Sequence, residues 1–192
     1  MKRVGIFGGS FNPIHFGHIR LARQLLSLAN LDEVWFVVSP QNPLKQQSDL
    51  IDNELRFEMV KLALHREKAL YASDVEFLLP RPSYTWNTLE KLKADYPNFE
   101  FILLIGGDNW ARFPMWYRSA DIIGHYPIVV YPRTGSVFDM QGLPANVNVV
   151  HTRRINISST MVRQRIREQQ SISRLVPKTV ASFIQDHHLY LD

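Results

Sequence analysis

Short runs of apolar residues alternate along this chain with longer segments in which apolar residues recur every three or four positions. The short runs predict strands buried on both faces, and the longer segments predict amphipathic helices. The expected strands cover residues 4–7, 34–38, 70–76, 99–105, 127–131 and 147–150. Such alternation predicts an α/β fold built on a Rossmann-like, doubly wound parallel sheet.

Helices are expected between these strands and after the last one. They cover residues 17–28, 54–64, a segment ending near residue 95, and residues 109–113, 116–123, 158–168 and 178–186. Ser83 or Thr85 is expected to cap the helix that ends near residue 95, and Ser158 or Ser159 the helix at 158–168. With 192 residues, we expect one domain over residues 1–192, with a small C-terminal helical part at about 157–192.

Composition and charge narrow the class of protein. Hydrophobic residues make up 45% and charged residues 21%, which is typical of a soluble globular enzyme. The absence of cysteine excludes disulfides and cysteine-based zinc sites. The formal charge is +4, and the basic residues are scattered apart from Arg153-Arg154 and a group of three at positions 163, 165 and 167. This pattern favours a local site for a small anion over a nucleic-acid surface. No apolar stretch is as long as a membrane span, so we expect a cytoplasmic protein.

The stretch GGSFNPIHFGH at residues 8–18 joins the first expected strand to the first expected helix. A glycine turn in that position gathers backbone N–H groups and a positive helix end, which predicts an anion site. Turn chemistry accounts for the glycines but not for His15 and His18. Their imidazole groups could hold a nucleotide phosphate and stabilise developing charge. A zinc site is the alternative, but no third ligand stands nearby in the sequence.

A second cluster, ISSTMVR at residues 157–163, opens the next-to-last expected helix. It is either a plain helix cap followed by a solvated arginine, or a second anion site built from hydroxyls, free N–H groups and a guanidinium. Ligands of doubly wound sheets bind outside the carboxyl ends of the strands. Residues 8–18, 39–45, 106–108 and Arg133 are all expected at that edge.

Three further side chains leave alternatives open. Asp108 could cap a short helix, hold a ribose hydroxyl or help to place Mg²⁺. Trp86 or Trp116 could stack on a flat ring, although tryptophans at helix starts usually belong to the core.

The two motifs resemble a known superfamily. Residues 8–18 resemble the G-G-S/T-F-D/N-P-x-H-x-G-H signature of the nucleotidyltransferases, and residues 157–163 resemble their I-S-S/T-T-x-x-R phosphate motif. Five further segments are similar to the bacterial nicotinate-nucleotide adenylyltransferase family: residues 43–45, 82–85, 106–108, 113–116 and the tail at 176–190. The resemblance covers nearly the whole chain. Asn87 departs from the pattern, since the family often has an acidic residue there.

The resemblance implies adenylyl transfer from ATP to nicotinate mononucleotide, which gives deamido-NAD and pyrophosphate in NAD biosynthesis. It implies that His15, His18 and Arg163 are catalytic. The implied ATP-binding set is Gly8, Gly9, Ser10, Phe11, His15, His18, Gly106, Asp108, Ser158, Ser159, Thr160 and Arg163. The implied mononucleotide-binding set is Lys45, Thr85, Trp116 and Arg133, with Trp116 stacked on the pyridine ring. Mg²⁺ is expected with ATP, held by substrate oxygens more than by the protein, which needs no metal site of its own.

The implied reaction agrees with the residues present. The attacking phosphate is already an anion, so positioning and charge stabilisation suffice without a general base. The rivals are a phosphopantetheine adenylyltransferase, a cytidylyltransferase, a non-catalytic nucleotide sensor and a basic nucleic-acid binder. The first two would not need the turn at residues 83–85 or Trp116, and a sensor could lose one of the two histidines. No nucleic-acid or membrane partner is expected, and the sequence is compatible with a homo-oligomer.

Overall fold

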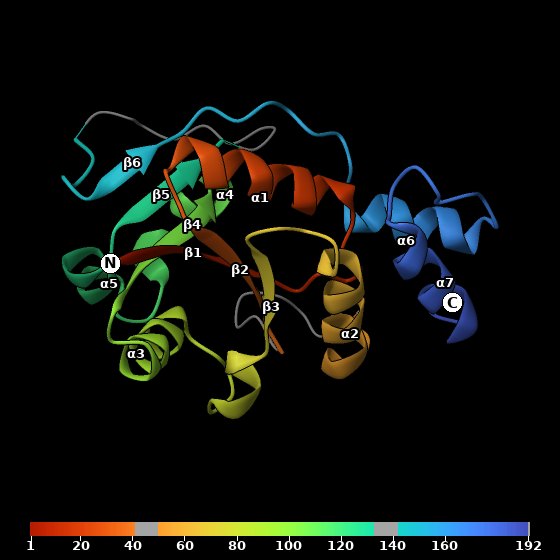
Figure 1. The fold of residues 1–192 in the computed structure, drawn as a ribbon, viewed down its shortest axis with the longest axis horizontal. Coiled ribbons are helices and arrows are strands. Elements are labelled where there is room, and N and C mark those ends of the chain that lie inside the picture. Colours follow the sequence, from red (N-terminus) through yellow and green to blue (C-terminus); the bar gives the residue numbers. More distant parts are fainter. Residues whose placement is uncertain (41–49, 133–141, 192) are drawn as a thin grey trace.

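The computed structural model describes residues 1–40, 50–132 and 142–191. Its centre is a six-stranded sheet in which every neighbouring pair is parallel, with the order β3-β2-β1-β4-β5-β6 (Figure 1). The strands are β1 (Lys2–Gly9), β2 (Glu33–Val38), β3 (Leu70–Ser73), β4 (Phe99–Gly106), β5 (Ile128–Tyr131) and β6 (Val147–Val149). The prediction of a Rossmann-like α/β fold is therefore confirmed.

Helices connect the strands and close the chain. They are α1 (Phe16–Leu28), α2 (Asn53–Leu64), α3 (Thr85–Asp95), α4 (Gly107–Trp110), α5 (Ser119–His125), α6 (Ser159–Arg167) and α7 (Lys178–Asp186). Two 3₁₀ turns, η1 (Val75–Leu78) and η2 (Phe113–Met115), lie between them. No helix in the described part of the chain is both long and apolar enough to cross a membrane.

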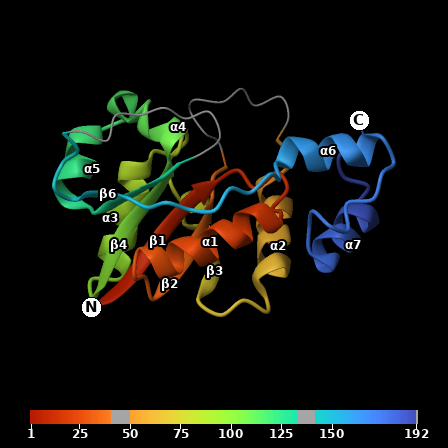
Figure 2. The ribbon, with the colours of Figure 1, turned by 90° about the horizontal axis from the view of Figure 1, so that it is seen from above.

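Alternate residues of the central strands supply two hydrophobic cores, one on each face of the sheet. Ile6 of β1 belongs to the core closed by Leu89 of α3 and Ile122 of α5, whereas the adjacent Phe7 belongs to the core under Leu25 of α1. Successive side chains of a strand point to opposite faces, so a strand covered on both faces must be apolar throughout. Figures 1 and 2 show α1 and α3 on opposite sides of the sheet.

The C-terminal helices extend the core that lies beneath α1. Val162 of α6 and Val180 of α7 are fully buried in the same cluster as Met59 of α2. Both helices lie at one end of the molecule, beyond α2 (Figure 2). The single-domain organisation with a helical part at about 157–192 stays a prediction.

Some expected element bounds were wrong, for local reasons. The third strand ends at Ser73 and not at Glu76, because the carbonyl of Asp74 accepts from Phe77 and starts the turn η1. The predicted helix at 116–123 begins three residues late, because Arg118 has a left-handed backbone (φ 55°). The short helix predicted at 109–113 is replaced by α4, which begins two residues earlier, and by the turn η2.

The predicted side-chain cap of α3 was also wrong. The N-cap residue is Tyr84, and its side chain makes no capping hydrogen bond. The hydroxyl of Ser83 donates instead to a buried carboxylate at Glu76, 2.8 Å away. The cap predicted for α6 is confirmed at Ser158, whose hydroxyl accepts from the backbone N–H of Met161.

Candidate active site

The carboxyl ends of β1, β2 and β4 meet at one edge of the sheet. β1 pairs with β2 on one side and with β4 on the other, so the direction of winding reverses between β1 and β4. Gly8 and Gly9 end β1, Ser39 follows β2 and Gly106 ends β4. The crevice outside such a reversal is the usual ligand site of a doubly wound sheet. Lys45 and Arg133, also expected at this edge, lie outside the described residues.

The two signature histidines stack on each other at the start of α1. Their ring centroids are 3.7 Å apart and the rings are inclined by 21°. His15 is the N-cap residue and is buried, whereas His18 lies in the first turn and is half-buried. The backbone N–H of His15 donates to Nδ1 of His18 at 3.3 Å. A neutral His18 therefore carries its proton on Nε2, which makes Nε2 a hydrogen-bond donor.

Glycine at position 17 allows the second motif to approach the first. A Cβ at Gly17 would lie 2.7 Å from Nδ1 of His15 and 3.2 Å from the carbonyl oxygen of Ile157. The first separation is too short for a real side chain and the second is tight, so a larger residue would displace the His15 ring and press on residue 157. A Cβ at Gly8 would meet nothing within 4 Å, so Gly8 faces open space at the strand end.

Three hydrogen bonds fix the start of α6. Two join it to the signature loop, residues 8–18, and the third caps the helix. Nη1 of Arg163 donates to the carbonyl oxygen of Asn12 at 2.8 Å. The hydroxyl of Ser159 donates to the carbonyl oxygen of Pro13 at 2.9 Å. The third is the Ser158 cap. The amino end of α6 is thereby held beside residues 12–13, next to the start of α1, and both helix ends favour an anion.

Arg163 has one donor that this arrangement leaves available. Its Nε is buried, and it has no hydrogen-bond partner among the residues that the structure describes. A buried guanidinium N–H without a partner is costly, and a phosphate oxygen would satisfy it. Thr160, in the first turn of α6, is exposed.

Two other residues of the expected ATP set differ in exposure, since Phe11 is buried and Asp108 is exposed. Phe11 is only 2% exposed and packs against Phe7 and Phe36, so its ring supports the loop and only its backbone can face a ligand. Asp108 is exposed in α4, where Gly106 is the N-cap residue; the alternative that Asp108 caps this helix is wrong. Within residues 1–40, 50–132 and 142–191, no three acidic or histidine side chains are grouped to hold a metal ion.

The expected acceptor-side residues lie on two neighbouring segments. Thr85 begins α3, and Trp116 follows η2, where its ring packs on Phe113 at 5.2 Å. The rings of Tyr84 and Tyr117, one residue from each, are 4.8 Å apart and bring the segments together. Nε1 of Trp116 is buried without a hydrogen-bond partner in the described part of the chain.

Trp86, the other tryptophan considered for stacking, belongs to the core. It is 7% exposed, and the guanidinium of Arg118 covers its ring at 4.3 Å. Trp116, by contrast, is only half-buried.

Arg56 of α2 is a site-supporting residue that the sequence analysis missed. It is 1% exposed, and its Nη1 donates to the carbonyl oxygens of Ser10 (2.6 Å) and Ser39 (2.8 Å), so that it ties together the loops that follow β1 and β2. Burial lowers the pKa of this guanidinium. The available signal was its spacing, since Arg56 occupies the same helical stripe as buried Met59, Val60 and Ala63.

Glu76 is a second missed residue, and it braces the start of α3. Its carboxylate is 7% exposed and accepts from Ser83 at 2.8 Å and from Thr88 at 2.9 Å, on either side of Thr85. Burial raises the pKa of Glu76, and the hydroxyl donors oppose that effect. No sequence signal indicated this role, because Glu76 stood at the end of an expected strand.

Comparison with known proteins shows the family to which the chain belongs. The model of the cytidylyltransferase-like family matches residues 6–165. A Bacteroides thetaiotaomicron protein named "Probable nicotinate-nucleotide adenylyltransferase" is 46% identical over 185 residues, covering 96% of this chain and 92% of the relative. A Bacteroides fragilis protein of the same name is 50% identical over 162 residues, covering 84% and 81%.

Solved structures share the fold. The nicotinic acid mononucleotide adenylyltransferase of Plasmodium falciparum, complexed with NaAD, superposes with a TM-score of 0.81 at 18% identity, covering 99% of this chain and 98% of that chain. At this identity the likeness speaks for the fold alone, whereas the bacterial relatives match nearly the whole length at much higher identity. The chain belongs to the nicotinate-nucleotide adenylyltransferase family, within the wider cytidylyltransferase-like group.

Proposed function

We propose that this protein transfers the adenylyl group of ATP to nicotinate mononucleotide, forming deamido-NAD and pyrophosphate in NAD biosynthesis. The observation that carries the proposal is the joining of two anion-binding helix starts, α1 and α6, through Arg163 and Ser159 at the reversal of the sheet. The names of the bacterial relatives support the choice of acceptor. The Plasmodium falciparum structure contains NaAD, which is the expected class of product.

On the donor side, the triphosphate would lie at the helix starts. Gly8, Gly9 and Ser10 let it approach the end of β1, and Ser158 and Thr160 stand at the start of α6. Ser159 already donates within the protein, so its part is to hold the loop at Pro13. Gly106 and Asp108 would contact adenosine.

The chemistry is a direct displacement at phosphorus. A phosphate oxygen of the mononucleotide forms a bond to the α-phosphorus, the bond from that phosphorus to the bridging oxygen breaks, and pyrophosphate leaves with the electron pair. The nucleophile is already ionised, so no base is required. Nε2–H of His18 and the free Nε–H of Arg163 would stabilise the charge that builds on the transferring group, while stacked His15 fixes the ring of His18. Mg²⁺ enters with ATP as part of the substrate, with phosphate oxygens as its main ligands.

On the acceptor side, Trp116 would stack on the pyridine ring, and Thr85, Lys45 and Arg133 would hold the rest of the mononucleotide. The buried, unpartnered Nε1 of Trp116 supports this role, because a polar group of the ligand would satisfy it. The cytoplasmic location, the absence of nucleic-acid and membrane partners and a homo-oligomeric state stay predictions.

The proposal is tested by measuring turnover with ATP and Mg²⁺ and each of three acceptors: nicotinate mononucleotide, nicotinamide mononucleotide and phosphopantetheine. We expect the first to be used best, and turnover of phosphopantetheine alone would overturn the proposal. Replacing ATP with CTP tests the cytidylyltransferase alternative in the same assay.

A pair of variants then tests the ring-stacking role. Trp116→Ala removes the ring and should raise the KM for the mononucleotide by about tenfold or more, a size typical of lost stacking on one base. Trp116→Phe keeps an aromatic face without Nε1 and should raise it less. In both variants the KM for ATP should stay close to that of the parent.

A further inference from the structure

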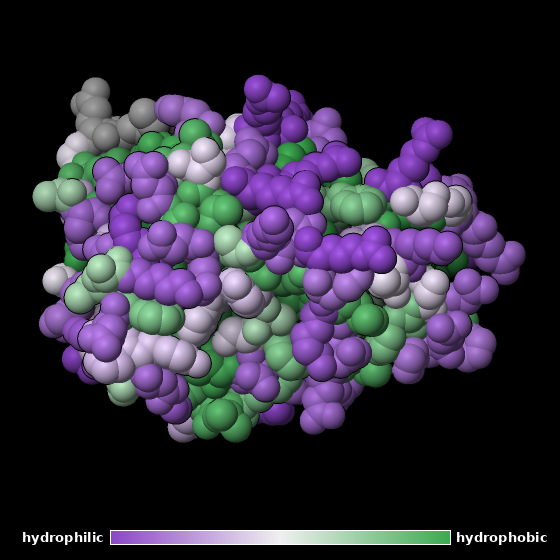
Figure 3. All heavy atoms as spheres, in the orientation of Figure 1, coloured by the Kyte–Doolittle hydropathy of each residue, from purple (hydrophilic) through white to green (hydrophobic). Residues whose placement is uncertain are grey.

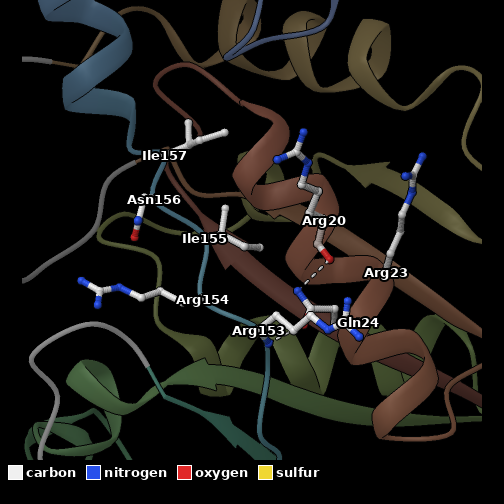
Figure 4. A pocket seen from close by; sticks show the side chains of 8 residues that line it. All are labelled: Arg20, Arg23, Gln24, Arg153, Arg154, Ile155, Asn156 and Ile157. Atoms are coloured by element: carbon white, nitrogen blue, oxygen red, sulfur yellow. Dashed lines mark hydrogen bonds between the residues drawn. The ribbon is translucent and has the colours of Figure 1, made fainter.

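A pocket rich in arginine runs beside the proposed active site. It has a volume of about 520 Å³, and it lies between α1 and the chain segment that leads into α6 (Figure 4). We call it the arginine pocket. It is lined by Arg20, Arg23, Gln24, Arg153, Arg154, Ile155, Asn156 and Ile157. In the space-filling view, strongly hydrophilic side chains gather over this side of the molecule (Figure 3).

The positive charge of the pocket is largely uncompensated. Arg23 pairs with Glu67: its Nε and Nη2 donate to the two carboxylate oxygens at 2.9 and 2.6 Å. Arg20, Arg153 and Arg154 have no ion pair within the described residues, and helix α1 contains no acidic residue. Guanidinium groups gathered in one pocket repel each other, and an anion bound among them would relieve that repulsion.

The two walls of the pocket are held together by one side chain. The Nε2 of Gln24 donates to the carbonyl oxygen of Arg20, and its Oε1 accepts from the backbone N–H of Arg153. A single residue thus fixes the segment that carries Arg153 and Arg154 against α1. The backbone that carries Arg153 is therefore positioned against α1, which lowers the entropy cost of bringing the two walls to a ligand.

The arginine pocket uses a different part of α1 from the proposed donor site. Successive residues of a helix are separated by about 100°, so Arg20 and Arg23 lie about 200° and about 140° around the axis from His18. The pocket ends at Ile157, directly before the cap residue Ser158 of α6. The two sites are neighbours, but they do not share side chains.

We propose that the arginine pocket is a second anion site that binds a compact diphosphate or triphosphate: free pyrophosphate or tripolyphosphate, or the phosphate chain of a nucleotide. Guanidinium groups match the oxygens of such chains in pairs. Arg20 lines the wall formed by α1, and Arg153 and Arg154 line the wall formed by the segment that leads into α6. A nucleic-acid backbone would instead need a long basic track, whereas this pocket is short and concave. The proposal does not depend on which acceptor the enzyme uses.

The test is a calorimetric titration of the protein with tripolyphosphate at low ionic strength. The parent protein should bind two anions per chain, one at each site. The variant Arg20→Gln/Arg153→Gln/Arg154→Gln should lose the pocket component, with a fall in that affinity of about tenfold or more. Its turnover of ATP and nicotinate mononucleotide should stay at the parental rate.

A charge-matched control separates site binding from general attraction. Arg165→Gln/Arg167→Gln/Arg174→Gln removes the same formal charge from exposed positions outside the pocket, and it should keep both sites. Parallel titrations with pyrophosphate and with ATP distinguish the source, because a second site filled only by the inorganic anions identifies the free anion. If the triple variant unfolds, Arg153→Gln alone is titrated, and hydrogen exchange at residues 153–157 should show less protection by tripolyphosphate.

Three results would overturn the proposal. One is a single tripolyphosphate per parent chain, and another is an equal loss of binding in the control variant. The third is an affinity for single-stranded oligonucleotides that rises with length between about 10 and 30 nucleotides and exceeds that for tripolyphosphate, since this would assign the surface to nucleic acid.

Discussion

Nη1 of Arg163 donates to the backbone carbonyl oxygen of Asn12 at 2.8 Å, across 151 positions of the chain. The side chain of the same asparagine accepts at 2.8 Å from the hydroxyl of Tyr190, near the C-terminal end. Asn12 therefore joins the signature loop to both the second phosphate motif and the tail. We call the starts of α1 and α6, which are proposed to hold the phosphates, the phosphate clamp. The bond from Arg163 joins its two halves, and the bond from Tyr190 supports Asn12 from the tail.

Arg163→Ala should lower both stability and activity. It removes a charged hydrogen bond to Asn12 and the Nε donor offered to phosphate, so we expect the free energy of unfolding to fall by about 2 kcal/mol and kcat to fall by about 10²-fold. Urea unfolding and steady-state kinetics measure the two effects. Tyr190→Phe is the matched control, because it loses a hydrogen bond to Asn12 while the guanidinium remains. An Arg163→Ala enzyme that loses stability but keeps its kcat would contradict the clamp.

His18→Ala should reduce kcat by about 10²-fold or more while the protein stays folded, because it removes a donor aimed at the transferring phosphate. The measurement is kcat with both substrates saturating, together with the melting temperature. His65→Ala is the control, since His65 is exposed at the end of α2. A near-normal kcat for His18→Ala would show that His18 only shapes the loop.

Arg56→Met should destabilise the protein by about 3 kcal/mol. The substitution fills a similar volume, but it leaves the partly buried carbonyl oxygens of Ser10 and Ser39 without their charged donor. Arg66→Met, at an exposed position just beyond α2, should change the urea midpoint very little. Equal midpoints for the two variants would mean that the bridge between the β1 and β2 loops contributes no stability.

Glu76 should make stability depend on pH with a definite sign. Burial raises the pKa of Glu76 in the folded protein above its ordinary value near 4.5. The folded state then favours the protonated form, so the contribution of Glu76 is fully present below the ordinary pKa and is lost as pH rises toward the folded pKa. Glu76→Gln cannot ionise and keeps similar hydrogen-bonding atoms. Its melting temperature relative to the parent should therefore rise between about pH 4 and about pH 8.

An exposed carboxylate provides the control for that measurement. Asp186→Asn, at the end of α7, should follow the parent across the same pH range. If the melting temperature of Glu76→Gln instead fell relative to the parent as pH rose, the hydroxyl groups of Ser83 and Thr88 would outweigh burial, and the pKa would be lowered.

Much of the fold was already contained in local patterns of the sequence. Apolar runs located all six strands, and three-to-four-residue spacing located the long helices, because burial on one or both faces imposes a period that is visible in the chain. The predicted helix bounds were wrong where one residue has an unusual backbone conformation. Arg118, before α5, has a left-handed φ that no pattern in the sequence predicts. The Ser158 cap was predictable because capping is a local interaction between residues three apart in the chain.

The sequence by itself determined the sheet class, the two motifs at residues 8–18 and 157–163 and the sheet edge at which the first motif lies, since each depends on neighbours within a few residues. Only the tertiary structure decided how those parts become one site. The bond from Arg163 to Asn12, the burial of Arg56 beneath Ser10 and Ser39, and the carboxylate of Glu76 behind Thr85 all join residues far apart in the chain. Such contacts follow from strand order and from the cost of leaving buried polar groups unpaired, and both are properties of the packed molecule.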